Sequence, residues 1–161
     1  MRHDRQAAFL QILNNKETLI KKTRELKIEN NVFFIDYSKN IFNILCKCKF
    51  FLLTSLWEDP GFVLFEAALS NTPIISSNCR NGHLDIMDNE KNGFLFVNNN
   101  VEDLVDKYNQ FKLLNKFEVK KKSISAKKYI KKFFSVVFNL FNIQSCIFFI
   151  IILFSSLLVG V

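Results

Sequence analysis

Four short apolar runs stand out along the first two thirds of the sequence, and segments with helical spacing separate them. The runs, each of a length typical of a buried strand, are Val32–Ile35, Phe50–Leu53, Pro73–Ser77 and Phe94–Val97. Apolar residues at helical spacing predict helices over residues 5–28, 39–47, 61–70 and onward from a cap at Asn100. Because the runs are apolar on both faces, we predict an α/β domain with a doubly wound parallel sheet. Ligands of such sheets bind beyond the carboxyl ends of the strands.

The last part of the chain has a different pattern. Residues 133–161 contain no charged residue, which predicts an apolar C-terminal helix long enough to cross a bilayer. A narrow polar stripe over residues 133–145 leaves three arrangements open. The segment is a tilted transmembrane helix, an interfacial helix with an inserted end, or a helix that docks on another domain.

A block of lysines precedes this apolar segment. Nine lysines and only one acidic residue, Glu118, lie between Lys112 and Lys132, so the block accounts for the net charge of +7. It indicates an anionic partner, either a membrane surface or a nucleic acid. Lysines beside an apolar segment are typical of the cytosolic side of a membrane, which favours the membrane surface. No recognisable nucleic-acid-binding fold accompanies the block, so no nucleic acid is expected.

The cysteines and the N-terminus indicate the compartment. The four cysteines have no metal-binding spacing, and we expect free thiols in a reducing compartment. Residues 1–14 lack a secretory signal. We therefore expect a cytoplasmic protein at the inner face of the membrane.

The loop after Phe50–Leu53 carries the candidate chemistry. Gly61 opens the helix that follows, and glycine lets a ligand approach the backbone closely. The free N–H groups of Gly61, Phe62 and Val63 then form a helix end with partial positive charge. Such an end binds phosphate or carboxylate oxygens.

Two carboxylates flank this helix start. Glu58 lies in the loop before it, and Glu66 lies within the helix with a side chain that leans back toward the same mouth. A sugar or ribose diol, with paired hydroxyl donors, would bridge them. The alternative is that acidic residues merely complement the helix dipole. This accounts for Glu58 but not for Glu66, which sits among apolar residues on a helix that packs on a sheet.

The same residues resemble a known family. Glu58 and Glu66 stand in the Glu-x7-Glu arrangement of glycosyltransferase family 4, also called group 1 glycosyltransferases, and the segment around them is similar to its signature helix. Three further blocks resemble that family in the same order, namely Asn71–Ile75, Ser77–Ile86 and Asn92–Phe96. The likeness covers roughly residues 17–113.

The resemblance implies a fold and a division of the chain. Residues 1–113 would be part of a Rossmann-like nucleotide-sugar-binding (donor) domain, half of a GT-B fold. Residues 114–132 would be a basic linker, and residues 133–161 an apolar helix that associates with a membrane or docks. The family's acceptor domain and the strand with its Arg/Lys pair have no counterpart in the sequence. We therefore expect a donor domain cut short at its N-terminus.

The resemblance also implies a role for each matching residue. Glu58, the catalytic candidate, would contact the hydroxyls of the donor sugar. Gly61, Phe62 and Val63 would offer backbone N–H groups to sugar and phosphate. Glu66 would hold the ribose hydroxyls of the nucleotide.

A second loop adds donor-binding candidates. Arg80, Asn81 and Gly82 lie in the block that resembles the family's loop after the third strand. Arg80 either substitutes for the missing basic pair or is an exposed loop side chain. His83, where the family usually has proline, is either a general base or a loop residue without catalytic duty.

The implied reaction is that of a hexosyltransferase-type enzyme. It would transfer a sugar from a nucleoside diphosphate donor to a polysaccharide, glycolipid or lipid-linked acceptor, with the anomeric configuration retained. Neither a metal nor a cofactor is expected, since the departing phosphate helps to deprotonate the acceptor in this family and no Asp-x-Asp triplet is present. The alternative is a non-catalytic nucleotide-binding remnant, or a subunit that needs a separate acceptor domain.

Overall fold

The structure is a computed structural model of the chain. It describes residues 8–9, 16–35, 38, 40–58, 61–79, 84–88 and 90–140. The candidates Arg80, Asn81 and Gly82, and the segment 141–161, lie outside the described residues.

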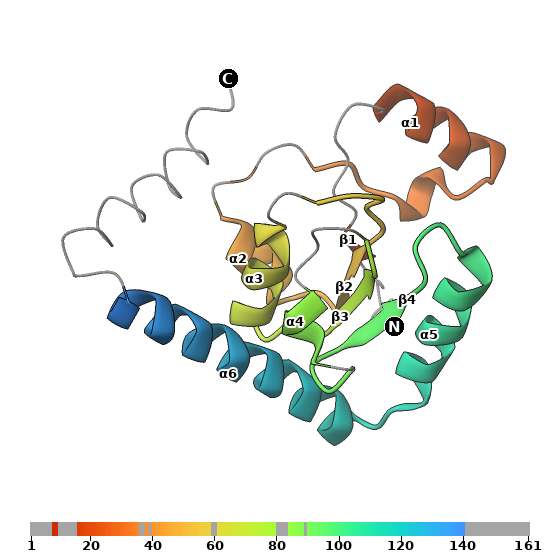
Figure 1. Cartoon of the computed structure of the whole chain (residues 1–161). Coiled ribbons are helices and arrows are strands. Elements are labelled where there is room, and N and C mark those ends of the chain that lie inside the picture. Colours follow the sequence, from red (N-terminus) through yellow and green to blue (C-terminus); the bar gives the residue numbers. More distant parts are fainter. Residues whose placement is uncertain are drawn as a thin grey trace.

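One parallel sheet forms the centre of the molecule (Figure 1). Its strands follow one another in sequence order, and they are β1 (Ala8–Phe9), β2 (Phe50–Leu53), β3 (Ile74–Ser77) and β4 (Phe94–Phe96). Each neighbouring pair is parallel, which confirms the predicted parallel α/β sheet. Since β1 contributes only two residues, β2, β3 and β4 form the body of the sheet.

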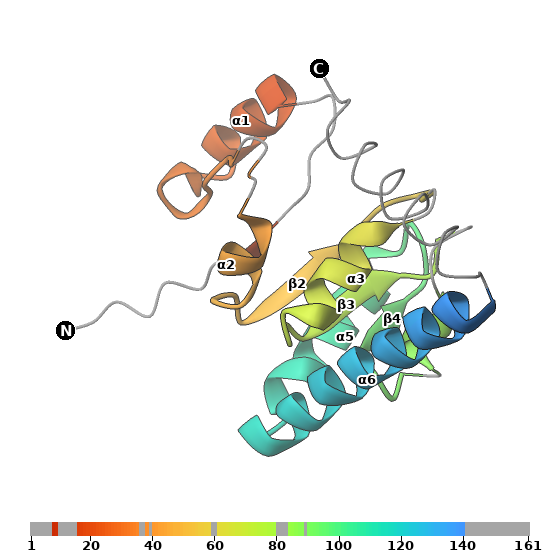
Figure 2. The same cartoon turned by 90° about the vertical axis from the view of Figure 1, so that its left-hand side faces the viewer.

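Helices cover both faces of this sheet. The helices of the described chain are α1 (Lys16–Glu25), the 3₁₀ helix η1 (Glu29–Asn31), α2 (Ile41–Leu45), α3 (Phe62–Leu69), α4 (Leu84–Met87), α5 (Val101–Leu113) and α6 (Lys116–Leu140). Helix α3 lies on one side of the sheet and α5 on the other (Figures 1 and 2). Because neighbouring strands are parallel, the chain must cross over the sheet between them, and a helix lies in each of these crossovers.

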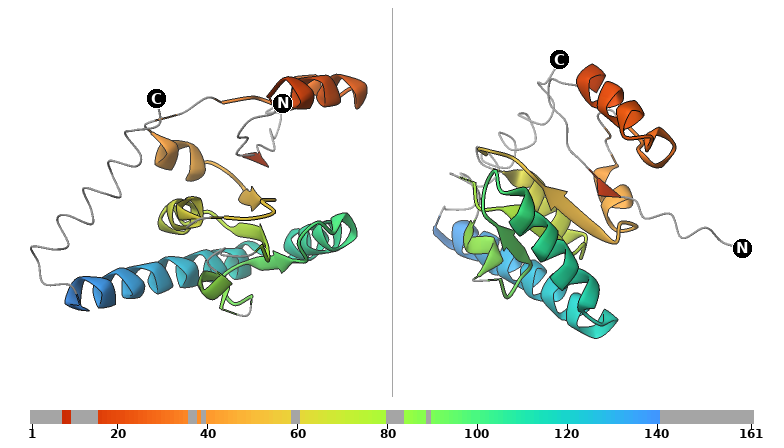
Figure 3. Two further views of the ribbon diagram at one scale, coloured as in Figure 1. Left: turned by 45° about the horizontal axis from the view of Figure 1, so that its top comes forward. Right: turned by 90° about the vertical axis from the view of Figure 1, so that its right-hand side faces the viewer.

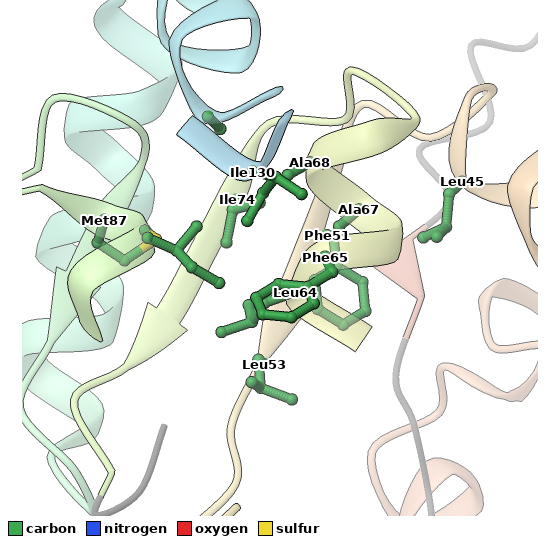
Figure 4. Packing of buried hydrophobic residues seen from close by; sticks show 12 residues of the cluster. Leu45, Phe51, Leu53, Leu64, Phe65, Ala67, Ala68, Ile74, Met87 and Ile130 are labelled. Atoms are coloured by element: carbon green, nitrogen blue, oxygen red, sulfur yellow. The ribbon is translucent and has the colours of Figure 1, made fainter. Parts of the chain in front are cut away.

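Two apolar clusters hold these layers together. Successive strand residues point to opposite faces of a sheet. Phe51 and Leu53 join the buried cluster beneath α3 and α6 (Figure 4), whereas Phe50 and Leu52 pack toward α5. Full burial of a large apolar side chain stabilises a fold by roughly 1.5–3 kcal/mol. The two clusters explain why the strand runs are apolar at every position.

The basic segment differs from the prediction. The sequence predicts a linker over residues 114–132, but Lys116–Leu140 forms one helix, α6, which runs along one side of the molecule (Figure 3). Ser123, Ala126 and Ile130 are buried and recur at helical spacing, so one face of the helix packs on α3 and the core. The linker interpretation weighed the lysines and overlooked this stripe.

The start of α6 is fixed by a capping box. The side-chain oxygen of Asn115 accepts a hydrogen bond from the backbone N–H of Glu118 at 3.0 Å. The Glu118 carboxylate accepts one from the backbone N–H of Asn115, also at 3.0 Å. Glu118, the acidic residue of the lysine block, thus caps the start of α6.

The described part of the apolar tail continues α6. Phe134 packs edge-on against Phe65 of α3, with the ring centroids 5.7 Å apart. The separate apolar C-terminal helix of the prediction is therefore not seen over residues 133–140. Within the part of the chain that the structure describes, no helix is both long enough and apolar enough to traverse a bilayer.

Two predictions near the N-terminus are wrong. Residues 32–35 belong to no strand of the described chain, and Phe33 and Ile35 are 69% and 52% exposed. Of the helix predicted over residues 5–28, the described residues Ala8–Phe9 form strand β1 instead, and Lys16–Glu25 form helix α1. An apolar run predicts burial, but it does not say whether a neighbouring strand is there to receive it.

Candidate functional site at the carboxyl ends of the strands

Helix α3 begins directly above the sheet with Gly61 as its N-cap. Gly61 is buried and has φ 61° and ψ 37°, a left-handed conformation that glycine adopts without strain. The first backbone bond of the helix runs from the N–H of Leu64 to the carbonyl of Gly61, at 3.1 Å. The N–H groups of Gly61, Phe62 and Val63 therefore have no partner within the helix, and they form its electropositive end.

Glu66 is the ionisable residue with an unusual environment in this helix. Its side chain is half-buried, while Phe65, Ala67 and Ala68 beside it are buried. Burial raises the pKa of the Glu66 carboxyl above its ordinary value. No ion pair to this carboxylate is found among the described residues. A hydroxyl donor from a ligand would relieve this desolvation.

Glu58 lies in the loop between β2 and α3 and is also half-buried. No hydrogen bond or ion pair joins it to Glu66 within the described ranges. The chain order places both carboxylates around the start of α3, one before it and one within it. Their approach to a common ligand remains a prediction.

Hydrogen bonds tie the β2–α3 loop to the two neighbouring loops. The Ser77 hydroxyl, at the end of β3, donates to the carbonyl of Ser55 at 2.6 Å. The amide NH2 of Asn98, just after β4, donates to the carbonyl of Leu56 at 2.9 Å. The backbone N–H of Asn98 donates to the side-chain oxygen of Asn78 at 2.7 Å. These hydrogen bonds hold together the loops that follow β2, β3 and β4. One of the tethered residues, Leu56, lies two residues before Glu58 in the sequence.

Sequence reasoning missed these tethering residues. Their signal was a polar side chain at or near the end of two strands, because Ser77 ends β3, Asn78 follows it, and Asn98 lies two residues after β4. Polar residues after strands also begin ordinary turns, so sequence alone does not identify their partners. The amide oxygen of Asn98 is buried without a hydrogen-bond partner among the described residues.

The predicted loop candidates cannot be placed in this geometry. Arg80, Asn81, Gly82 and His83 lie outside the described residues, between the buried Cys79 and helix α4. Among the residues that the structure does describe, no cluster of histidine, cysteine or acidic side chains is arranged to hold a metal ion.

The fold and this edge define a class of protein. They form a Rossmann-like α/β unit in which helix α3 begins at the carboxyl end of strand β2. The family model described as "Glycosyl transferases group 1" matches residues 9–132. The chain belongs to this family, and it corresponds to the C-terminal domain of its GT-B fold.

Individual relatives agree with this assignment. Poly(ribitol-phosphate) alpha-N-acetylglucosaminyltransferase of Staphylococcus aureus is 30% identical over 92 residues, which are 57% of this chain and 19% of that protein. A crystal structure of a mutant of S. aureus TarM in complex with Fondaparinux, alpha-GlcNAc-glycerol and UDP is 27% identical, with a TM-score of 0.67 over 73% of this chain and 24% of the other.

A solved domain matches over a larger share of its own length. The C-terminal domain of a group 1 glycosyl transferase (LpcC) from Francisella tularensis has a TM-score of 0.61 and 18% identity over 73% of this chain and 60% of the other. At that identity the likeness supports the fold. This chain spans about a fifth of the length of the curated relatives it matches.

Proposed function

We propose that the chain is the donor-binding part of a hexosyltransferase-type glycosyltransferase. The enzyme would move a sugar from a nucleoside diphosphate donor to a polysaccharide, glycolipid or lipid-linked acceptor, with the anomeric configuration retained. The observation that carries this proposal is Glu66, a half-buried carboxylate with a raised pKa on a helix whose first N–H groups have no partner within the helix. Family membership and the UDP in the TarM complex support a nucleotide donor.

The proposed roles follow from the chemistry of the site. The N–H groups of Gly61, Phe62 and Val63 would bind the diphosphate through the positive helix end. Glu66 would accept hydrogen bonds from the ribose hydroxyls, and Glu58 would accept them from the sugar. A carboxylate accepts such bonds more strongly than a neutral oxygen does, and a dry site strengthens them further.

Two further donor contacts are proposed from the family resemblance. Arg80 would balance the charge of the diphosphate, and Asn81 and Gly82 would bind the donor beside it. The reaction would use neither a metal nor a cofactor, because the leaving phosphate would help to deprotonate the acceptor.

A second candidate function rests on the matched region, which corresponds to the C-terminal domain of the family's fold. The chain would then be a nucleotide-binding subunit or remnant that needs a separate acceptor domain for catalysis. Both functions predict nucleotide binding, and sugar transfer by the chain alone distinguishes them.

We also propose a location in the cytoplasm at the inner face of a membrane. The support is the order of the sequence, in which the lysine block precedes residues 133–161 with no charged residue. A glycolipid or lipid-linked acceptor fits that location.

Titration calorimetry with UDP, GDP and their sugars tests the donor site. The wild-type chain should bind one nucleotide series. Glu66→Ala should weaken binding of the nucleotide and its sugar alike by at least about tenfold, because a hydrogen bond to a charged group contributes about 1.5–3 kcal/mol. Glu58→Ala should weaken only the sugar nucleotide. Glu102→Ala, at an exposed site on α5, is the matched control. Equal affinity of Glu66→Ala and wild type would remove the assignment.

A further inference from the structure

We infer that the outward face of α6 is a docking surface for an anionic lipid bilayer. The inference rests on the membrane location proposed above but not on sugar transfer. Vesicle binding and nucleotide binding therefore succeed or fail separately.

The first observation is a face of unpaired positive charge. Six lysines of α6 are exposed, and they are Lys116, Lys120, Lys121, Lys128, Lys131 and Lys132. None of them makes an ion pair with a described residue. Glu118, the acidic residue of the segment, is occupied in the capping box. The field of this face is therefore positive from Lys116 to Lys132.

One lysine of the helix behaves differently and marks the limit of the face. The Lys122 ammonium turns inward, donates to the carbonyls of Glu90 and Gly93, and lies 4.8 Å from the centre of the Phe94 ring. Desolvation lowers the pKa of Lys122. The lysines on the outer face have no such structural task.

The second observation is an apolar line through the centre of the lysine face. Phe117 is 75% exposed and Ile124 is 38% exposed. At 3.6 residues per turn these two side chains lie on the same line of the helix. On that geometry Lys120 falls on one flank of the line and Lys121 and Lys128 fall on the other. An interfacial helix has this layout, because apolar side chains enter the lipid while lysines reach the headgroups.

The connection before α6 also exposes apolar and basic side chains. Leu113, at the end of α5, is 85% exposed. An open hollow of about 350 Å³ lies where α5 meets α6. Lys112, Lys116 and Lys120 line it together with apolar residues, among them Phe111, Leu114 and Val119. Cationic side chains around a hollow are suited to a headgroup phosphate.

Charge and continuity favour lipid over other occupants. The opposite face of α6 is already used, since Ala126 and Ile130 are buried in the core. A nucleic acid would bind the lysines but would leave the apolar line in water. A bilayer satisfies both parts of the face. Lys132 is also the last charged residue of the sequence, so the chain continues from this face as an apolar segment.

Cosedimentation of the full chain with vesicles tests the inference. Binding is measured to vesicles of phosphatidylcholine that contain about 30% phosphatidylglycerol by weight, which imitate an anionic leaflet, and to vesicles of pure phosphatidylcholine. Both are measured at low and high salt. The triple variant Lys120→Gln, Lys121→Gln, Lys128→Gln should bind anionic vesicles on the order of a hundredfold more weakly. Phe117→Ser should weaken binding at both salt concentrations.

Two matched variants and one competing ligand complete the test. The triple variant Lys21→Gln, Lys27→Gln, Lys47→Gln removes the same charge from exposed sites elsewhere and should bind like wild type. Changing the three α6 lysines to arginine should retain binding. Equal vesicle binding by the two glutamine variants would overturn the inference. So would tighter binding of a duplex oligonucleotide than of anionic vesicles, measured by fluorescence anisotropy.

Discussion

Glu66 carries opposing requirements in one side chain. Its burial disfavours the charged form, whereas the proposed contact with ribose hydroxyls needs the charged form. Residues of binding sites often combine a structural cost with a functional gain in this way. The stability of the chain without ligand reports the cost of burying the carboxylate alone, separately from its proposed contact with the ribose.

The raised pKa of Glu66 makes a prediction about pH. The pKa of Glu66 is higher in the folded chain than in the unfolded chain, so protonation of this carboxyl favours the folded state. This contribution to stability is fully present below the unfolded pKa and is lost as the pH rises through the folded pKa, where the buried carboxyl becomes charged. Glu66→Gln removes the charge and keeps the shape. The variant should therefore melt at a higher temperature than wild type at pH 7, and the difference should shrink toward pH 4. Thermal unfolding followed by circular dichroism measures both, and a difference independent of pH would contradict the prediction.

Gly61 makes a prediction about the backbone. With φ at 61°, an added Cβ is strained whatever the surrounding space. Gly61→Ala should lower the free energy of unfolding by about 1–2 kcal/mol. Gly61→Asn should cost less, because asparagine tolerates this conformation. Urea denaturation of the two variants measures the difference, and equal losses would indicate that a steric clash, not φ, decides the cost.

At the scale of elements, local chemistry predicted some parts of the fold and not others. The runs that form β2, β3 and β4 were predicted within one residue of their observed bounds. Both faces of these strands are covered, so most residues of each run are apolar and the run is easy to recognise. The cap at Asn100 was also predicted, and its side chain accepts from the N–H of Asp103 at 3.0 Å. The run over residues 32–35 failed because pairing depends on a strand distant in sequence.

The candidate site divides in the same way. The glycine at the start of α3 follows from the local sequence, and so does the order of Glu58 and Glu66. The tethers from Ser77 and Asn98 link loops that are 22 and 42 residues apart in the chain. No periodicity reports contacts of that kind. The prediction of a linker in the basic segment was wrong for a different reason. It considered the many lysines and not the small and apolar residues between them, which form a buried stripe of the helix.

Helix α6 can be tested as part of the core. Ile130 is fully buried against α3, whereas Ile124 on the same helix is 38% exposed. Ile130→Ala should lower the free energy of unfolding by about 2–5 kcal/mol, because it leaves a cavity. Ile124→Ala, the matched control, should cost less than about 1 kcal/mol. Chemical denaturation compares them, and equal small losses would show that α6 does not belong to the folded unit.

The tether between the loops is a second prediction at this scale. Asn98→Ala removes the hydrogen bond to the carbonyl of Leu56, which should release the loop that carries Glu58. We expect faster amide hydrogen exchange over residues 54–58 and a loss of about 1 kcal/mol in stability. Asn109→Ala, on the exposed side of α5, should leave that exchange unchanged. Unchanged exchange in Asn98→Ala would mean that other contacts hold the loop.

The whole molecule exposes apolar side chains away from both proposed surfaces. Leu26, Phe33, Ile35 and Phe42 are each at least 48% exposed. The first three lie in the segment that joins α1 to α2, and Phe42 lies in α2. Exposed apolar side chains promote the association of proteins when they gather on one surface. Helix α1 lies beside this segment and apart from the sheet (Figures 1 and 2).

This exposure leads to a prediction about solubility. The double variant Phe33→Ser, Ile35→Ser should remain soluble at higher concentration than wild type. Its free energy of unfolding should change by no more than about 1 kcal/mol, since exposed side chains contribute little packing. Static light scattering against concentration measures the first and urea denaturation the second. A large loss of stability would show that the two side chains are buried in solution.

The burial of Ile130 has a consequence for the order of events during synthesis. Chains emerge from the ribosome N-terminus first, and parallel sheets need contacts between distant segments. Strands β2, β3 and β4 therefore leave the ribosome before the helix that seals their core exists. Until residue 130 has been made, Phe65 and Ile74 present an uncovered apolar layer to the cytosol. The nascent chain should accordingly be a client of chaperones that shield exposed apolar surface, and it should become independent of them only near the end of translation.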